Sequence, residues 1–174
     1  FNDFGCGEST SVNVRINPLP YVEIIGQDTI CEGEQTTFYA SGNEDLSYLW
    51  NTESITSYIP VSEANVYSVT VTNDNDCRST AYKTLVVKPK PPVNITGDLS
   101  VCPGFGTTLT AHGGSGYTWS DGKTSAENTV FPTNGYNTDT VTATGNNGCS
   151  ASASVTVTIH PPGPSFTITG PTSF

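Results

Sequence analysis

The stretch IGQDTICEGEQTTFYASG (25–42) occurs a second time, with changes, as ITGDLSVCPGFGTTLTAHGG (95–114). Within these stretches, Cys102 follows Cys31 by 71 positions. A constant step of this size predicts one folding unit copied along the chain. Each copy lies near the lower size limit for a domain that folds alone, where covalent links or neighbouring domains commonly help.

Further matches extend the repeat across the chain. TNDNDC (72–77) returns as TGNNGC (144–149), and Trp119 follows Trp50 by nearly the same step. Proline-rich joints, which favour extended and semi-rigid backbone, fall at equivalent points, at 17–20, 88–92 and 160–164. We therefore expect the C-terminal strand of a preceding repeat, two complete repeats and the first strand of a following repeat, over residues 1–18, 19–89, 90–161 and 162–174.

The composition points to an extracellular or cell-surface protein. Six Lys and Arg residues against sixteen Asp and Glu residues give a net charge of −10, which argues against nucleic acid and anionic lipid as partners. No apolar run approaches the length of a membrane helix, so membrane insertion is not expected. Cysteines at positions set by the repeat suit an oxidising exterior better than the cytosol.

The residue pattern predicts an all-β fold. Short runs alternate between apolar and polar residues and are bounded by Gly, Asn, Asp or Pro, as in half-buried strands. Six or seven such strands per copy, with Trp50 or Trp119 on a central strand, predict tandem immunoglobulin-like β-sandwich repeats arranged end to end. The two tryptophans are expected in the cores. The clearest alternating runs contain Thr36, Phe38 and Ala40; Tyr67, Val69 and Val71; Thr107, Leu109 and Ala111; and Val155, Val157 and Ile159.

The pattern ITG-x-x-x-(I/V)-C-x-G, Y-x-W, V-T-x-T-x-N and V-x-P-x-P runs through both copies in the same order, with single residues changed in one copy or the other. This order resembles the tandem Ig/PKD-like repeats of large secreted surface proteins in Bacteroidetes-type bacteria. That group includes gliding-motility adhesins and other substrates of type IX secretion. The resemblance implies repeats that act as spacers and project a terminal binding region from the cell.

Two positions depart from this pattern, and two threonines fit a modification signal. Asp139 stands where Tyr67 of the first copy would place an aromatic ring, and Asp76 replaces the usual Gly before the cysteine. Both departures are interpreted as drift of a structural repeat. Thr29 and Thr140 lie in D-T-aliphatic triplets that resemble the O-glycosylation motif of exported proteins in the same bacterial group, so they are candidate glycosylation sites.

The cysteines allow two hypotheses. One pairs Cys31 with Cys77 and Cys102 with Cys149, within each copy. However, the second and sixth strands of an Ig-like sandwich run the same way, which would separate Cys31 from Cys77 by about 20 Å, whereas a disulfide needs Cα atoms about 4.4–6.8 Å apart. The alternative, which we favour, joins Cys31 to Cys149 and leaves Cys6, Cys77 and Cys102 to pair outside this stretch.

Catalysis finds no support in the sequence. Ser115, Ser120 and Asp121 lie near His112, but no nucleophile-turn motif accompanies them and the first copy has no equivalent. The other histidine, His160, lies in a proline-rich joint. The cysteines lack zinc spacing, and no glycine-rich phosphate loop is present. The chain is therefore predicted to be no enzyme and to need no cofactor.

The acidic residues in the turns make calcium the metal to consider. Glu32, Glu34, Asp74 and Asp76 supply oxygen ligands at turns. Exposed turns favour such residues anyway, no loop has EF-hand spacing, and the equivalent hairpin of the second copy is GNNG. No metal site is therefore predicted.

Two functions from different classes remain. The first is a non-enzymatic structural segment, a stalk or filament, of a secreted or cell-surface adhesin-like protein, with neighbouring repeats or like chains as partners. The alternative is a glycan- or protein-binding accessory module. Tyr39, Tyr58 and Tyr82 are the aromatic residues expected on the surface, and the second copy lacks aromatic equivalents of Tyr39 and Tyr82. A ligand site shared by every repeat is therefore not expected.

Overall fold

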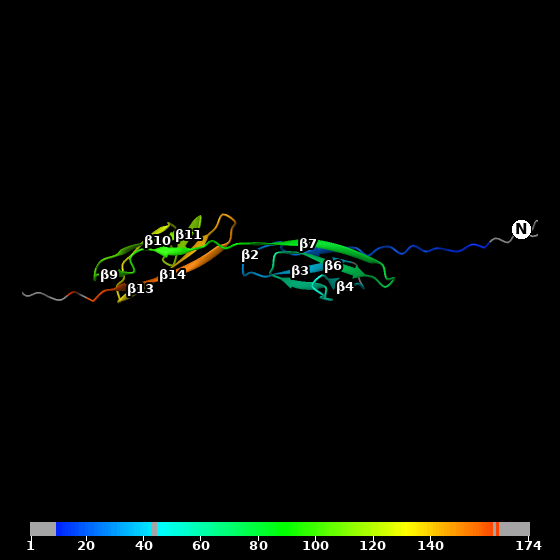
Figure 1. Ribbon diagram of the computed structural model, residues 1–174, viewed down its shortest axis with the longest axis horizontal. Coiled ribbons are helices and arrows are strands. Elements are labelled where there is room, and N and C mark those ends of the chain that lie inside the picture. Colours follow the sequence, from blue (N-terminus) through cyan, green and yellow to red (C-terminus); the bar gives the residue numbers. More distant parts are fainter. Residues whose placement is uncertain (1–9, 43–44, 162, 164–174) are drawn as a thin grey trace, which may run out of the picture. The chain divides into compact units, whose positions relative to one another are not determined.

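A computed structural model describes residues 10–42, 45–161 and 163 of the chain. The chain divides into two compact units, with the boundary in the sequence between Val87 and Lys88. Every regular element in the described ranges is a β-strand (Figure 1). None of the described residues belongs to a helix able to cross a membrane. Of the predicted flanking strands, residues 1–9, 162 and 164–174 lie outside the described residues, and residues 10–18 form no strand.

The first unit has two sheets, of three and four strands. The sheet orders are β1-β3-β5 and β2-β7-β6-β4. The pairs β1–β3, β3–β5, β4–β6 and β6–β7 are antiparallel, with Trp50 of β4 opposite Val69 of β6. The strands are β1 (Val22–Ile25), β2 (Thr29–Cys31), β3 (Thr36–Gly42), β4 (Ser47–Trp50), β5 (Tyr58–Val61), β6 (Asn65–Thr72) and β7 (Arg78–Lys88).

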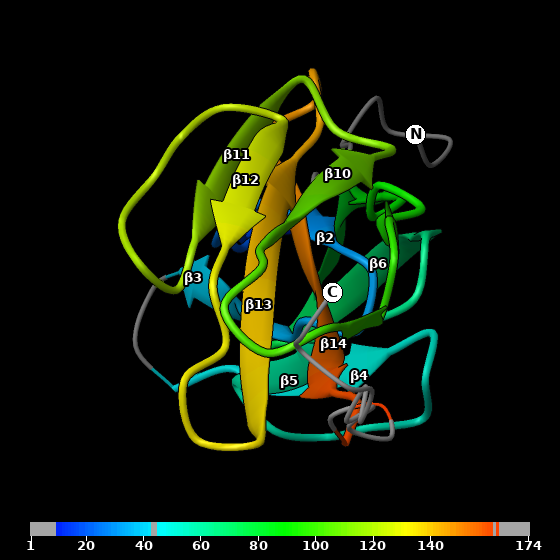
Figure 2. The ribbon, with the colours of Figure 1, turned by 90° about the vertical axis from the view of Figure 1, so that its left-hand side faces the viewer.

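The second unit repeats this arrangement strand for strand. Its sheet orders are β8-β10-β12 and β9-β14-β13-β11, and β9 runs parallel to β14. In Figure 2, β13 and β14 run beside each other through this unit. Two facing sheets with this order form an immunoglobulin-like sandwich, so the predicted all-β fold of Ig-like repeats is confirmed. The strands are β8 (Asn94–Thr96), β9 (Ser100–Val101), β10 (Thr107–His112), β11 (Gly116–Trp119), β12 (Glu127–Val130), β13 (Tyr136–Thr144) and β14 (Ser150–Ile159).

A glycine in each unit lets the first strand cross from one sheet to the other. Gly26 has φ 137° between β1 and β2, and Gly97 has φ 143° between β8 and β9. A Cβ atom added at these positions would lie 2.4 Å from the carbonyl oxygen of Thr37 and 2.6 Å from that of Thr108. Only glycine adopts this backbone without strain and leaves room for the neighbouring strand.

The two tryptophans lie in the centres of the two cores. Trp50 packs with the buried residues of the first unit and Trp119 with those of the second. Each indole donates its Nε1 hydrogen to a backbone carbonyl in the loop after its strand, that of Thr56 at 2.8 Å and that of Ser125 at 2.9 Å. A buried indole that also anchors a loop explains why this residue recurs in both copies.

Candidate functional site

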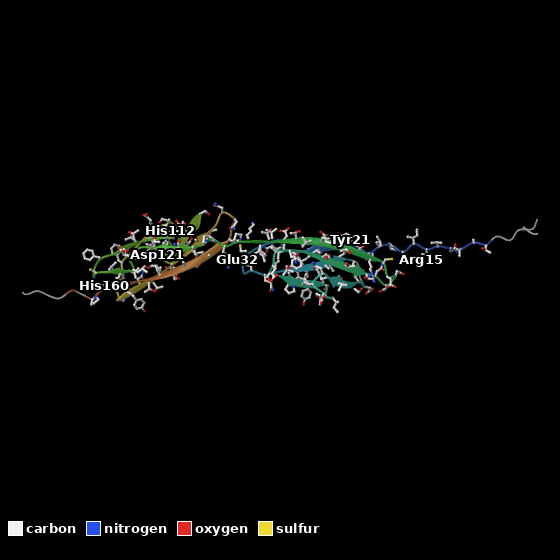
Figure 3. The ribbon with its side chains drawn as sticks, in the orientation of Figure 1. Arg15, Tyr21, Glu32, His112, Asp121 and His160 are labelled. Carbon is white, nitrogen blue, oxygen red and sulfur yellow. The ribbon has the colours of Figure 1, made fainter. Side chains whose placement is uncertain are left out.

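The residues that resemble a catalytic triad in the sequence bond to other partners. His112 Nε2 lies 2.9 Å from the hydroxyl of Thr96. The Ser115 hydroxyl donates to a backbone carbonyl of β13, and Asp121 pairs with Lys123 at 3.0 Å. Figure 3 labels both histidines and Asp121. The structure therefore does not assemble a Ser/His/Asp arrangement from these residues.

The acidic residues of the turns have local roles. Glu34 Oε2 accepts a hydrogen bond from the backbone N–H of Cys31 at 2.9 Å. Asp76 adopts φ 58°, at the position where Gly148 of the second unit has φ 85°. Asp tolerates this left-handed conformation better than most residues, because its short polar side chain bonds locally. Within the described ranges, no group of three or more His, Cys, Asp or Glu residues is arranged to hold a metal ion.

The cysteines differ in their state. Cys31 and Cys149 are both disulfide-bonded, whereas Cys77 and Cys102 are free thiols. The hypothesis that pairs Cys31 with Cys77 and Cys102 with Cys149 is therefore wrong. The physical reason is the one that the topology gives, because a strand length separates the two ends of a sandwich. Cys6 lies outside the described residues.

The candidate glycosylation sites lie on strands. Thr29 begins β2 and is half-buried, and its hydroxyl donates to Asp28 Oδ1 at 3.2 Å. Thr140 lies within β13, also half-buried, with its hydroxyl 2.7 Å from that of Ser154. Glycosylation at these threonines stays a prediction.

The linker before each unit is held by the hairpin at the end of its sixth strand. In the first unit, Asn73 Nδ2 donates to the carbonyl of Pro18 at 3.3 Å. In the second, Asn147 Nδ2 donates to the carbonyl of Pro89 at 2.8 Å. An open hollow of about 300 Å³ lies beside this contact, lined by residues 89–92, Gly113 and 145–147. Among the described residues that line this hollow, Lys90 is the charged one.

An apolar row crosses the outer face of the three-stranded sheet of the first unit. Ile25 on β1 stands opposite Tyr39 on β3, which stands opposite Tyr58 on β5. The tyrosines are 50% and 51% exposed, and their ring centroids lie 5.9 Å apart with the planes inclined by 37°. In the second unit the corresponding row is polar and consists of Thr96, Thr110 and Glu127.

The second unit has a cluster of polar side chains in its interior. Asn128 on β12 is 1% exposed and Asp139 on β13 is 4% exposed. Lys123, in the loop between β11 and β12, donates from Nζ to Asn128 Oδ1 at 2.5 Å. Asn137 donates to Asp139 Oδ2 at 2.5 Å. Lys123 pairs with Asp121, and the side chains of these two residues are 49% and 38% exposed. We call the five residues the buried polar cluster, after Asn128 and Asp139 at its inner end.

Two carboxyl groups of this cluster differ in their pKa. Burial raises the pKa of Asp139, chiefly by removing water from its charged form, and the negative charge of Asp121 raises it further. The hydrogen bond from Asn137 and the positive charge of Lys123 oppose this rise. The pKa of Asp121 is lowered, mainly by its hydrogen bond with Lys123. Burial and the charge of Asp121 therefore favour the neutral form of Asp139, whereas Lys123 favours the carboxylate of Asp121.

The first unit has apolar contacts in place of the cluster. Tyr67, the equivalent of Asp139, packs edge-on against Phe38 with ring centroids 5.6 Å apart. Its hydroxyl donates to the carbonyl of Glu63 at 3.0 Å, the arrangement known as a tyrosine corner. The sequence shows the change at Asp139, and in the structure its carboxyl accepts a hydrogen bond from Asn137. Comparison of the copies also shows Ile59 replaced by Asn128, a signal that could have located the cluster.

Comparisons with known proteins give the following likenesses. No protein-family model matches the chain, and no curated protein matches it. The three N-terminal domains of the bacteriophage RB49 outer capsid protein Hoc are 21% identical over 80% of this chain and 59% of that one, with a TM-score of 0.43. Murine CEACAM1b is 12% identical over 80% and 100% of the two chains, with a TM-score of 0.37.

A third similar structure comes from a 1.5-MDa bacterial ice-binding adhesin, in work on its retention at the host cell surface. It is 11% identical over 83% of this chain and 66% of that one, with a TM-score of 0.38. The chain thus spans less than two thirds of the length of the Hoc and adhesin structures.

Proposed function

We propose that this chain is a non-enzymatic structural segment, a stalk or filament, of a secreted or cell-surface protein built from tandem Ig-like repeats. Its two repeats extend over residues 19–89 and 90–161, and residues 1–18 and 162–174 belong to flanking repeats. The proposed family is the large secreted surface proteins of Bacteroidetes-type bacteria that carry tandem Ig/PKD-like repeats, among them gliding-motility adhesins and other substrates of type IX secretion. The function of the chain then depends on its length and its stiffness.

The observation that carries this proposal is that the units share their framework but not their surfaces. The strand-crossing glycine, the loop-anchoring tryptophan and the hairpin that holds the linker occur in both units. By contrast, the exposed row of the first unit is apolar and that of the second is polar. Preservation of framework residues alone is what a mechanical role requires, because a shared ligand site would preserve surface residues.

We further propose that the disulfide joins Cys31 to Cys149. Both residues are disulfide-bonded, and the cysteines that would pair with them inside a unit are free thiols. A loop of this size contributes about 4–5 kcal/mol in the chain-entropy model. Such a bond persists in an oxidising compartment, which supports an extracellular location. Cys77 and Cys102 then remain for cysteines of further repeats.

Small-angle scattering of the oxidised chain in solution tests the structural role. We expect the maximum dimension of two sandwiches placed in series, unchanged by added glycans or peptides. A compact particle with the dimensions of one globule would contradict the proposal. Reduction of the disulfide, measured in the same buffer, controls for an effect of the bond on the shape.

The apolar row Ile25, Tyr39 and Tyr58 favours a second candidate function, a binding module. Exposed tyrosine rings offer faces on which sugars or apolar side chains can stack. Glycan-array binding that disappears in Tyr39→Ala and Tyr58→Ala, and persists in Tyr82→Ala, would favour this alternative. Tyr82 is the matched control because it is also exposed but lies on β7, in the other sheet.

A further inference from the structure

The buried polar cluster places an amine against a carboxamide. Lys123 Nζ lies 2.5 Å from Asn128 Oδ1, 3.2 Å from the carbonyl oxygen of Thr129 and 3.0 Å from Asp121 Oδ2. Within the described residues, Asn128 Nδ2 makes no hydrogen bond of normal geometry although the side chain is 1% exposed, and the amide contributes only weakly to lowering the pKa of Asp121. A buried amide nitrogen without a partner is costly, so its retention needs an explanation.

Asp139 is buried on β13, in the sheet opposite β12, and we place its carboxyl near this pair from two observations. Its equivalent in the first unit, Tyr67, contacts Phe38, and Phe38 stands beside Ile59, the equivalent of Asn128. The same packing sets Asp139 of β13 against the side of β12 that carries Asn128. The charges of Lys123 and Asp121 both act on the Asp139 carboxyl, which agrees with this placement.

The three functional groups have complementary chemistry. A lysine amine is a nucleophile once it loses its proton, and the Asp121 carboxylate lies within hydrogen-bonding distance to take that proton. Asp139, whose neutral form is favoured by burial, can donate a proton to the carboxamide oxygen. Prior orientation of amine and carboxamide inside a folded domain removes much of the entropic barrier to their reaction.

We propose that Lys123 and Asn128 form an intramolecular amide bond, with Asp139 as the acid that assists the reaction. Lys123 Nζ passes one proton to Asp121 and attacks Cγ of Asn128, while Asp139 protonates the carboxamide oxygen. The Nζ–Cγ bond forms and the Cγ–Nδ2 bond breaks as the carbonyl returns its proton to Asp139. The second Nζ proton moves to Nδ2, which leaves as ammonia and takes the proton held by Asp121 to become ammonium. No oxidant, metal or cofactor is needed.

The first unit provides an internal comparison. There, Ser54 stands at the position of Lys123, Ile59 at that of Asn128 and Tyr67 at that of Asp139. None of these three side chains carries an amine or a carboxamide, so no amide bond is expected in that unit. The amide in the second unit would close a ring between the loop after β11 and the start of β12.

Mass spectrometry of the complete, reduced and alkylated chain tests the bond. The intact mass should be lower than that of the sequence by one molecule of ammonia. Trypsin cuts after Lys83 and Lys123 but not after Lys88 and Lys90, which precede proline, and no Lys or Arg follows Lys123. Since an acylated lysine resists trypsin, the bonded chain should yield one peptide, 84–174, in place of 84–123 and 124–174.

Substitutions at Lys123 and Asp139 test the roles of the amine and of the acid in the reaction. Lys123→Arg keeps the positive charge but cannot form the bond, and Asp139→Asn keeps the volume but removes the acid, so both should show the full mass. Lys90→Arg should behave as the unchanged chain and is the matched control. Near-ultraviolet circular dichroism of the buried tryptophans verifies that each variant is folded.

Two outcomes would overturn the proposal. The first is a full intact mass with cleavage after Lys123 in the folded, unchanged chain. The second is loss of ammonia with cleavage after Lys123, because succinimides at Asn134-Gly135 or Asn147-Gly148 also release ammonia. Only the loss of ammonia together with the uncut 84–174 peptide supports the bond.

Discussion

At the residue scale, the equivalence of the units separates positions that hold the fold from positions that are free to change. Gly26 and Gly97 have the same backbone conformation and meet the same kind of neighbour, a carbonyl oxygen of the adjacent strand. By contrast, Tyr67 and Asp139 occupy one position with opposite chemistry, because their surroundings changed with them.

Gly97→Ala tests the strand crossing. The new Cβ would lie 2.6 Å from the carbonyl oxygen of Thr108, in a backbone with φ 143°, so the free energy of unfolding should fall by at least about 1–3 kcal/mol. Chemical denaturation followed by tryptophan fluorescence measures the loss. Gly116→Ala is the control, since a Cβ there meets no atom within 4 Å. Equal stability of the two variants would contradict the assigned role of Gly97.

The raised pKa of Asp139 should make the free energy of unfolding depend on pH. Because its pKa is raised in the folded state above the ordinary 3.8, the unfolded chain ionises first as the pH rises. Stability is therefore lost as the pH rises between these two pKa values, and a cost is already present at neutral pH. Asp139→Asn, compared in a Lys123→Arg background that cannot form an amide, should raise the melting temperature at pH 7.

The same pair of variants provides the check. Their difference in melting temperature should disappear below about pH 3.8, where the carboxyl is protonated in both states. A difference that is independent of pH would show that the substitution acts through packing and not through ionisation.

At the element scale, the strands and their inward faces could be predicted, because alternation and bounding turns are local properties. Leu109 and Ala111 on β10, for example, are buried as their spacing indicates. The buried polar cluster could not be predicted in the same way. Lys123 lies in a loop, Asn128 and Asp139 lie on strands of different sheets, and only the fold brings them together.

The same reasoning separates what was predictable about the cysteines. The period shows that Cys31 and Cys102 are equivalent, but not which cysteines bond. Topology was needed to argue against pairs within a unit, and the free thiols of Cys77 and Cys102 agree with that argument.

Asn147→Ala tests the contact between hairpin and linker. Asn147 donates to the carbonyl of Pro89 and accepts from the N–H of Cys149 at 3.0 Å. Loss of both bonds at an exposed site should cost about 1 kcal/mol and speed hydrogen exchange at the Cys149 amide. Asn146→Ala should leave that exchange unchanged. If both variants exchange alike, the side chain of Asn147 does not hold the hairpin.

At the scale of the whole molecule, the proposed disulfide decides how the two units respond to unfolding and to force. Cys31→Ser should lower the free energy of unfolding under oxidising conditions by about 4–5 kcal/mol, because the open chain regains the entropy that the loop removes. Cys102→Ser is the matched control, because Cys102 is a free thiol. Equal melting curves for the two variants would show that the disulfide of Cys31 does not stabilise the folded chain by closing this loop.

The most direct test of a tandem segment that resists force is single-molecule force extension of the chain held at its two ends. In the oxidised chain, residues 31–149 should stay in a closed loop and release no length. After reduction, two unfolding events should appear, one for each sandwich, each releasing about 3.3–3.6 Å per residue. Two full unfolding events in the oxidised chain, identical to those after reduction, would contradict the account.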